Sequence, residues 1–154
     1  MKPILFLDFD GVLNSADYMA ANPSAFDRRR STWEMIDPMA VMELNWLIER
    51  SGASCVVSST WRKLYPLSDL QRFLDRRGFT SKLLSCTPVK NNARGHEIQD
   101  WLNFYGYGES FVILDDDSDM VHLCPYLVKT SWKTGLTRHD CERALDVLQN
   151  GQEK

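Results

Sequence analysis

The sequence contains no long apolar stretch, because continuous apolar runs such as 4–7 and 111–114 span only a few residues. A transmembrane helix needs about 20 apolar residues, and Asp8 interrupts the N-terminal run at once. We therefore expect neither a membrane span nor a secretory signal. Basic charge is not in excess either, with 18 Lys and Arg against 21 Asp and Glu. This balance argues against a protein that coats nucleic acid non-specifically.

Paired cysteine motifs are also missing, since none of the four cysteines has C-x-x-C spacing. Zinc sites and thioredoxin-type redox sites are therefore disfavoured. Without an export signal, we expect reduced thiols in a cytoplasmic protein. The cysteines are Cys55, Cys86, Cys124 and Cys141.

The composition is that of an ordinary globular protein, with 44% apolar and 25% charged residues. A length of 154 residues fits one domain of roughly 100–200 residues, which we place at 1–154. Short apolar runs, typical of buried strands, alternate with amphipathic helical segments. The predicted strands are 4–7, 53–57, 82–85, 111–114 and 127–129.

Helix boundaries carry their own signals. Asp37-Pro38 is typical of a helix start and Gly52 of its end. Another helix is predicted over 67–78, one from about His96 to Gly106, and a last one after a Thr137–Asp140 capping box. The polar segment 15–37, with its basic run 28–30, is predicted to be an irregular loop or flap.

This order predicts an α/β fold in which a mostly parallel, Rossmann-like sheet has helices on both faces. In such sheets, ligands bind beyond the carboxyl ends of the strands. Two aspartate groups follow predicted strands, namely the pair Asp8 and Asp10 and the cluster 115–119. Each group alone could be a solvated turn or a helix cap, but together they offer the hard oxygen ligands that suit Mg²⁺. Neither group has the spacing of a calcium-binding loop.

Groups that could bind an anion follow the second strand and precede a later helix. The small hydroxyls of 58–60 can form an anion-binding concavity or simply cap a helix. Arg62 offers a guanidinium suited to phosphate. Arg94 could neutralise a phosphate, and Lys90 competes for that task.

In this order the motifs resemble those of the haloacid dehalogenase (HAD) superfamily of phosphohydrolases. The matching segments are 6–12 (D-x-D-G-V after a strand), 55–58, 94–98 and 112–116. A finer resemblance is to the small HAD domain of Swiss Army Knife RNA-repair proteins. It is carried by 58–62, 94–98, Trp101-Leu102, 115–119 and 134–137.

The resemblance implies a Mg²⁺-dependent phosphatase that works through an aspartyl-phosphate. It implies that Asp8 is the nucleophile and Asp10 the general acid and base. It also implies that Ser58 bonds the phosphoryl group and that Arg94 balances its charge. The metal is expected on the Asp8 carboxylate, the Asp10 carbonyl and an aspartate of 115–119.

The motifs leave two assignments open, namely which aspartate of 115–119 binds the metal and which serine bonds the phosphoryl group. A D-D pattern points to Asp116 with Asp115 beside it as the metal ligand, and a D-x-x-x-D pattern points to Asp115 and Asp119. The second matching segment, an apolar strand that ends in Ser or Thr, leaves a choice of one residue between Ser58 and Ser59. The residues expected to contact substrate are Gly11, Ser59, Arg62 and Lys90.

The intervals between motifs leave no room for a large cap domain, so the resemblance implies a capless or minimally capped site. An open site can admit a nucleotide or a terminal phosphate of a nucleic acid, which implies a role in nucleic-acid repair. Alternatives are a small-metabolite phosphatase, such as one for sugar phosphates, and a non-catalytic phospho-binding or receiver-like module. Trp61 and Trp101 are expected in the core, and His96, His122 and His139 are given no catalytic role.

Overall fold

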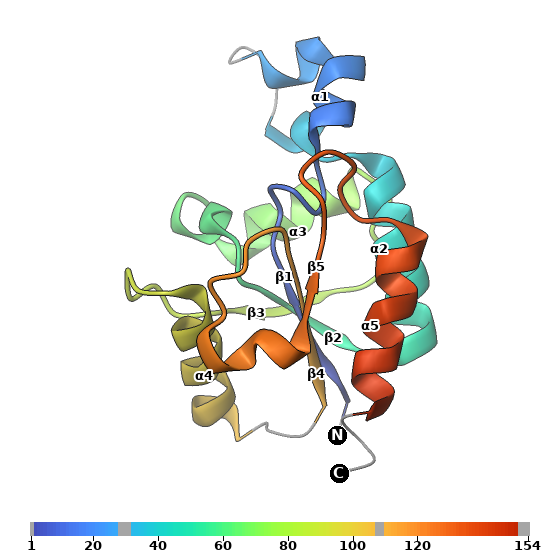
Figure 1. Cartoon of the computed structure of the whole chain (residues 1–154). Coiled ribbons are helices and arrows are strands. Elements are labelled where there is room, and N and C mark those ends of the chain that lie inside the picture. Colours follow the sequence, from blue (N-terminus) through green and yellow to red (C-terminus); the bar gives the residue numbers. More distant parts are fainter. Residues whose placement is uncertain (1, 28–31, 107–109, 151–154) are drawn as a thin grey trace.

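The computed structural model describes residues 2–27, 32–106 and 110–150. The strands of these residues form one parallel sheet in the order β3-β2-β1-β4-β5 (Figure 1). This arrangement confirms the predicted α/β fold, and each strand lies within one residue of its predicted limits. The strands are β1 (Ile4–Leu7), β2 (Ser54–Val57), β3 (Leu83–Cys86), β4 (Phe111–Asp115) and β5 (Leu127–Lys129).

Helices cover both faces of the sheet. Successive side chains of a strand point to opposite faces, so Leu5 and Leu7 pack with α2, α3 and α5, whereas Ile4 and Phe6 pack with α4 and η4. The α-helices are α1 (Ala16–Ala21), α2 (Pro38–Ser51), α3 (Leu67–Asp75), α4 (Arg94–Tyr105) and α5 (Arg138–Asn150). The 3-10 helices are η1 (Pro23–Phe26), η2 (Thr32–Met35), η3 (Thr60–Lys63) and η4 (Val121–Tyr126).

Four helix ends were predicted correctly, one of them the end of α4 at Gly106, which has a φ of 72°. The Asp37 carboxylate accepts a hydrogen bond from the Met39 amide at the start of α2, and Gly52 ends that helix with a φ of 69°. Thr137 and Asp140 bond each other's backbone amides reciprocally, as a capping box requires. The predicted start near His96 was wrong, because α4 begins at Arg94. Asp119 satisfies the first amides of this helix through its carboxylate and its carbonyl.

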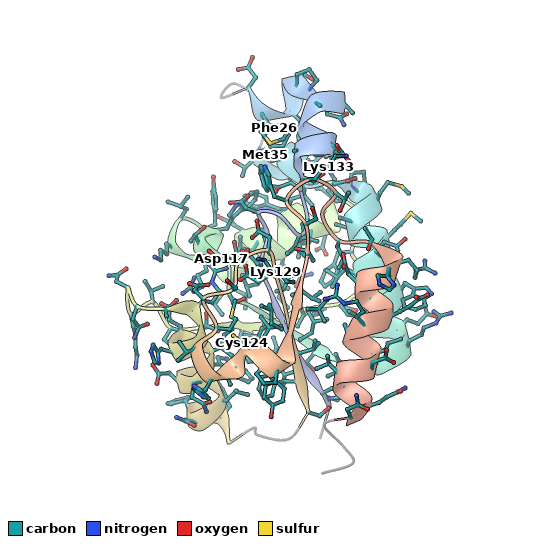
Figure 2. All side chains as sticks on the ribbon, in the orientation of Figure 1. Phe26, Met35, Asp117, Cys124, Lys129 and Lys133 are labelled. Atoms are coloured by element: carbon teal, nitrogen blue, oxygen red, sulfur yellow. The ribbon has the colours of Figure 1, made fainter. Side chains whose placement is uncertain are left out.

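The prediction of an irregular loop at 15–37 was also wrong for the described residues. Ser15 caps α1, and η1 and η2 follow it, with the basic run 28–30 outside the described residues. The Tyr18 hydroxyl and the Arg77 guanidinium both donate to the Glu34 carbonyl, which ties α1 and η2 to the end of α3. Figure 1 shows α1 projecting beyond the carboxyl edge of the sheet, and Figure 2 shows Phe26, Met35 and Lys133 gathered there.

The chain order places a topological switch point at β1. After β1 the chain builds β2 and β3 on one side, and it then returns to place β4 and β5 on the other. Open α/β sheets bind ligands at the carboxyl edge where the strand order reverses. Among the helices of the described residues, none combines the length and apolar character that crossing a bilayer requires.

Candidate active site

Three strand ends bring the predicted site residues to one edge of the sheet. The backbone hydrogen bonds of the sheet continue one residue beyond the strand ends. The Asp8 amide donates to the Leu114 carbonyl (3.0 Å), and the Ser58 amide donates to the Leu7 carbonyl (2.9 Å). The residues that directly follow β1, β2 and β4 are therefore neighbours. The convergence expected from the sequence follows directly from the parallel register.

An acidic cluster occupies this edge. One carboxylate oxygen from each of Asp8, Asp115 and Asp116 lies within 4.8 Å of the others, and Asp8 and Asp115 are buried. Gly11 makes this approach possible. It has a φ of 79°, and a Cβ built there would lie 2.2 Å from Asp116 Oδ2. Glycine is the residue that tolerates such a backbone at so short a distance.

Arg94, in the first turn of α4, faces the cluster. Its Nη1 lies 2.7 Å from Asp115 Oδ2 and 3.1 Å from Asp8 Oδ1. The first turn is fixed by Gly95, where an added Cβ would lie 2.1 Å from the Met120 carbonyl oxygen. The predicted cation thus lies in contact with the predicted nucleophile. Figure 2 marks Asp117, just past the cluster, and Lys129 at the end of β5.

Burial and like charge disturb the protonation of the cluster. Burial, followed by the charge of Asp115, raises the pKa of Asp8 to about 8, and Arg94 offsets only part of this shift. The same two causes raise the pKa of Asp116. Burial alone lowers the pKa of Arg94, but its two carboxylate partners raise it above its ordinary value. The cluster therefore carries more negative charge than one guanidinium compensates.

This donor set fits a magnesium ion. Mg²⁺ binds oxygen ligands, and it takes one or two carboxylates together with water or phosphate oxygens. Asp8 and Asp116 offer the carboxylates. Burial and the charge of Asp115 raise the pKa of each, so a bound cation would offset the cost of ionising them. Asp119 lies outside the cluster, since its carboxylate and carbonyl cap α4. The geometry thus favours the D-D pattern over D-x-x-x-D.

Ser58 and Ser59 differ in the state of their hydroxyls, although both side chains are buried. Ser59 Oγ accepts a hydrogen bond from the Trp61 amide and caps η3. Ser58 Oγ is the one buried side-chain polar atom of the described residues that has no hydrogen-bond partner. A buried hydroxyl without a partner is costly. Of the two serines, Ser58 is thus the one whose hydroxyl is free to bond a ligand.

Arg62 does not face the site, although the sequence predicted that it contacts the substrate phosphate. Its guanidinium donates to the carbonyls of Ser58, Ser59, Thr87 and Pro88 and pairs with Glu97 at 2.9 Å. The side chain is 1% exposed. Its donors are already used inside the fold, so the expectation of a phosphate contact is corrected to a structural role.

Lys90, the other expected cation, is half exposed and pairs with Asp100 of α4 at 2.9 Å. The expected core tryptophans are both buried. Trp101 packs edge-on against Phe6. Trp61 does more than fill space, because its indole donates to the Asp10 carboxylate. Sequence reasoning missed this contact and also missed Asn14, which donates to the same carboxylate.

The raised pKa of Asp8 predicts an unusual pH dependence of stability. Between the ordinary carboxyl value of 3.8 and about 8, the folded state binds a proton that the unfolded state releases, so stability falls as pH rises. In EDTA, we expect the thermal midpoint to fall by several degrees across this range, at roughly 2–4 °C per kcal/mol. Mg²⁺ replaces the proton and should stabilise the protein more at pH 8 than at pH 5.5.

Thermal unfolding followed by circular dichroism, in EDTA and in Mg²⁺, measures this effect. Asp8→Asn is the control, and it should flatten the pH dependence in EDTA and weaken the response to Mg²⁺. An unchanged slope in Asp8→Asn would contradict the assignment to Asp8.

A family model described as "HAD domain in Swiss Army Knife RNA repair proteins" matches residues 4–141. The match extends from β1 into α5 and includes every residue of the site. No curated protein matches the sequence significantly.

Proposed function

Because the chain belongs to the family of HAD domains found in Swiss Army Knife RNA repair proteins, we propose that it is a Mg²⁺-dependent phosphomonoesterase acting on a nucleotide or on a nucleic-acid terminal phosphate. The observation that supports this proposal most directly is the pairing of Arg94 with the buried Asp8 and Asp115, with the unpartnered hydroxyl of Ser58 at the neighbouring strand end. Carboxylates for a cation, a guanidinium for an anion and a free hydroxyl donor together match a phosphate dianion.

In the proposed reaction, an Asp8 carboxylate oxygen attacks phosphorus. The bond from phosphorus to the leaving oxygen breaks, and that oxygen takes the proton of Asp10. Water then attacks phosphorus and returns a proton to Asp10, while the bond between phosphorus and Asp8 breaks. Inorganic phosphate leaves, and both aspartates return to their starting states.

The remaining groups hold the phosphoryl group and its charge. Ser58 donates a hydrogen bond to a phosphoryl oxygen, and Arg94 balances the charge of Asp8 and of the phosphate. Asp8, Asp116 and the Asp10 carbonyl would hold Mg²⁺. When bound, the ion would keep Asp8 ionised and offset the repulsion between its carboxylate and the phosphate.

The proposed substrate class rests on the openness of the site. Between β1 and α2 the described residues add only the short helices α1, η1 and η2, so no cap domain inserted there covers the carboxyl edge. A polymer end can reach such an edge. Hydrolysis of 3′- and 5′-phosphorylated oligonucleotides, mononucleotides and sugar phosphates, each with Mg²⁺ and with EDTA, tests the proposal. Activity confined to sugar phosphates would contradict the nucleic-acid substrate, and no turnover on the whole panel would favour a phospho-binding module.

Two serine variants test the assignment of the second motif. Ser58→Ala should lower kcat by about 10–100-fold, because it removes a donor to the transferring group. It should leave stability unchanged or slightly higher, since the hydroxyl has no partner in the fold. Ser59→Ala removes a helix cap and should cost about 1 kcal/mol of stability with little change in kcat. Steady-state kinetics and urea unfolding of both variants decide the matter, and the reverse pattern would assign the role to Ser59.

A further inference from the structure

Two buried side chains donate to the same oxygen of the Asp10 carboxyl group. Asn14 Nδ2 lies 3.0 Å and Trp61 Nε1 lies 3.2 Å from Asp10 Oδ1. Asn14 is 2% exposed and Trp61 is 6% exposed. Within the part of the chain that the structure describes, no hydrogen bond reaches Asp10 Oδ2. Among the described residues, the carboxyl group is therefore held through Oδ1 alone.

Both donors are themselves fixed. Asn14 Oδ1 accepts a hydrogen bond from the Gly11 amide at 3.0 Å, and this bond turns the Nδ2 group of the amide toward Asp10. The Trp61 amide is bonded to Ser59 Oγ. Its ring packs between Phe9, with centroids 5.1 Å apart, and Tyr65, with centroids 6.3 Å apart. These contacts hold both donors in place on the Oδ1 side of the carboxyl group.

From this geometry we infer that Trp61 is a positioning residue that confines the mobile proton of Asp10 to Oδ2. The inference rests on the proposed function, in which Asp10 is the general acid. An indole N–H is only a donor, so it needs a lone pair on Oδ1 and disfavours a proton there. With Asn14 on the same oxygen, a protonated Asp10 must carry its proton on Oδ2.

This arrangement serves both halves of the reaction. In the first half, the Oδ2 proton passes to the leaving oxygen as its bond to phosphorus breaks. In the second half, Oδ2 takes a proton from water as the water oxygen bonds to phosphorus. Oδ1 is an acceptor both when Oδ2 carries the proton and when it does not, so both hydrogen bonds are compatible with the two transfers. Trp61 therefore acts on the direction of proton transfer and does not touch the phosphate.

A pair of substrates that differ only in the basicity of the leaving group tests this inference. Phenolate is a more basic leaving group than p-nitrophenolate and depends more on protonation. Trp61→Phe keeps an aromatic ring but removes the N–H donor. We expect it to lower kcat on phenyl phosphate by about 10-fold and on p-nitrophenyl phosphate by no more than about 2-fold, because misplacing the acid costs only part of its roughly 10²–10⁴-fold contribution.

Two further variants make the result interpretable. Asp10→Asn should show the same preference for the better leaving group, only larger. Trp46→Phe is the matched control on α2, where Trp46 packs against Arg50 and Arg138, and its kcat should be unchanged on both substrates. Should Trp61→Phe fail to fold, Trp61→Met offers a flexible apolar side chain that fills part of the site without a donor.

Each outcome has one meaning. Equal losses on both substrates in Trp61→Phe would make Trp61 merely structural and overturn the inference, even when Asp10→Asn shows the leaving-group effect. Absence of that effect in Asp10→Asn would instead contradict the proposed role of Asp10 as the acid.

Discussion

Asp8→Asn is expected to reduce Mg²⁺-dependent hydrolysis of p-nitrophenyl phosphate by about 10⁴-fold or more, because an amide oxygen cannot replace the attacking carboxylate. The substitution keeps the shape of the side chain, so the fold should persist. EDTA should abolish wild-type turnover as well, since Arg94 would then be the one cation that faces the three carboxylates of Asp8, Asp115 and Asp116 among the described residues.

The same substitution should raise the stability of the metal-free protein at pH 8. The pKa of Asp8 is raised by burial and by Asp115, so ionising Asp8 costs free energy in the folded state. Asn carries no charge and removes this cost. A variant that loses activity while gaining stability cannot be explained by misfolding, which makes the pair of measurements decisive.

Asp17→Asn is a matched control for charge. Asp17 is an exposed aspartate of α1 that pairs with Lys133 at 3.5 Å, and its substitution should leave kcat within about 2-fold and stability within about 0.5 kcal/mol. Residual turnover in Asp8→Asn above one-tenth of the wild-type rate would mean that another residue is the nucleophile.

Arg62→Met is expected to cost about 3–5 kcal/mol of stability. The substitution leaves Glu97 as a buried charge without its partner and removes donors from the carbonyls of residues 58, 59, 87 and 88. For a chain of this length the thermal midpoint should fall by more than about 6 °C. Arg62→Lys should not restore it, because one ammonium cannot replace the planar set of five donors.

Chemical unfolding and steady-state kinetics separate this structural role from phosphate binding. Glu97→Gln combined with Arg62→Met should recover part of the lost stability, since the unpaired charge is then gone. A variant with normal stability and a strongly raised KM would show instead that Arg62 contacts substrate.

Arg62 and Arg94 show what the sequence could and could not predict. Strand ends and motif order predicted which segments meet, so the placement of Asp8, Ser58 and Asp115 at one edge could be derived before the structure. The sequence did not show what each arginine contacts. Arg62 lies in the second motif yet turns inward to Glu97, 35 positions further along the chain, and no local pattern encodes that pairing.

The segment 15–37 shows a second limit. Its helices α1, η1 and η2 are four to six residues long, which is too short for a 3.6-residue periodicity to be visible. They are held by distant contacts, such as the Arg77 hydrogen bonds to the Glu34 and Trp33 carbonyls. Tertiary contacts of this kind override weak local preference. The same limit explains why the Trp61 bond to Asp10, across 51 positions, was not predicted.

The position of β1 has a consequence for the protein during its synthesis. Of the five strands, β1 is synthesised first, yet it lies in the centre of the sheet between β2 and β4. Until more than 100 residues have followed, one edge of this wholly apolar strand has no native partner, and an exposed apolar edge promotes aggregation. Asp8 and Asp10 stand directly beside it, and charges flanking an apolar strand oppose pairing between chains. We therefore expect the two aspartates to oppose such pairing before β4 brings Asp115 to the site.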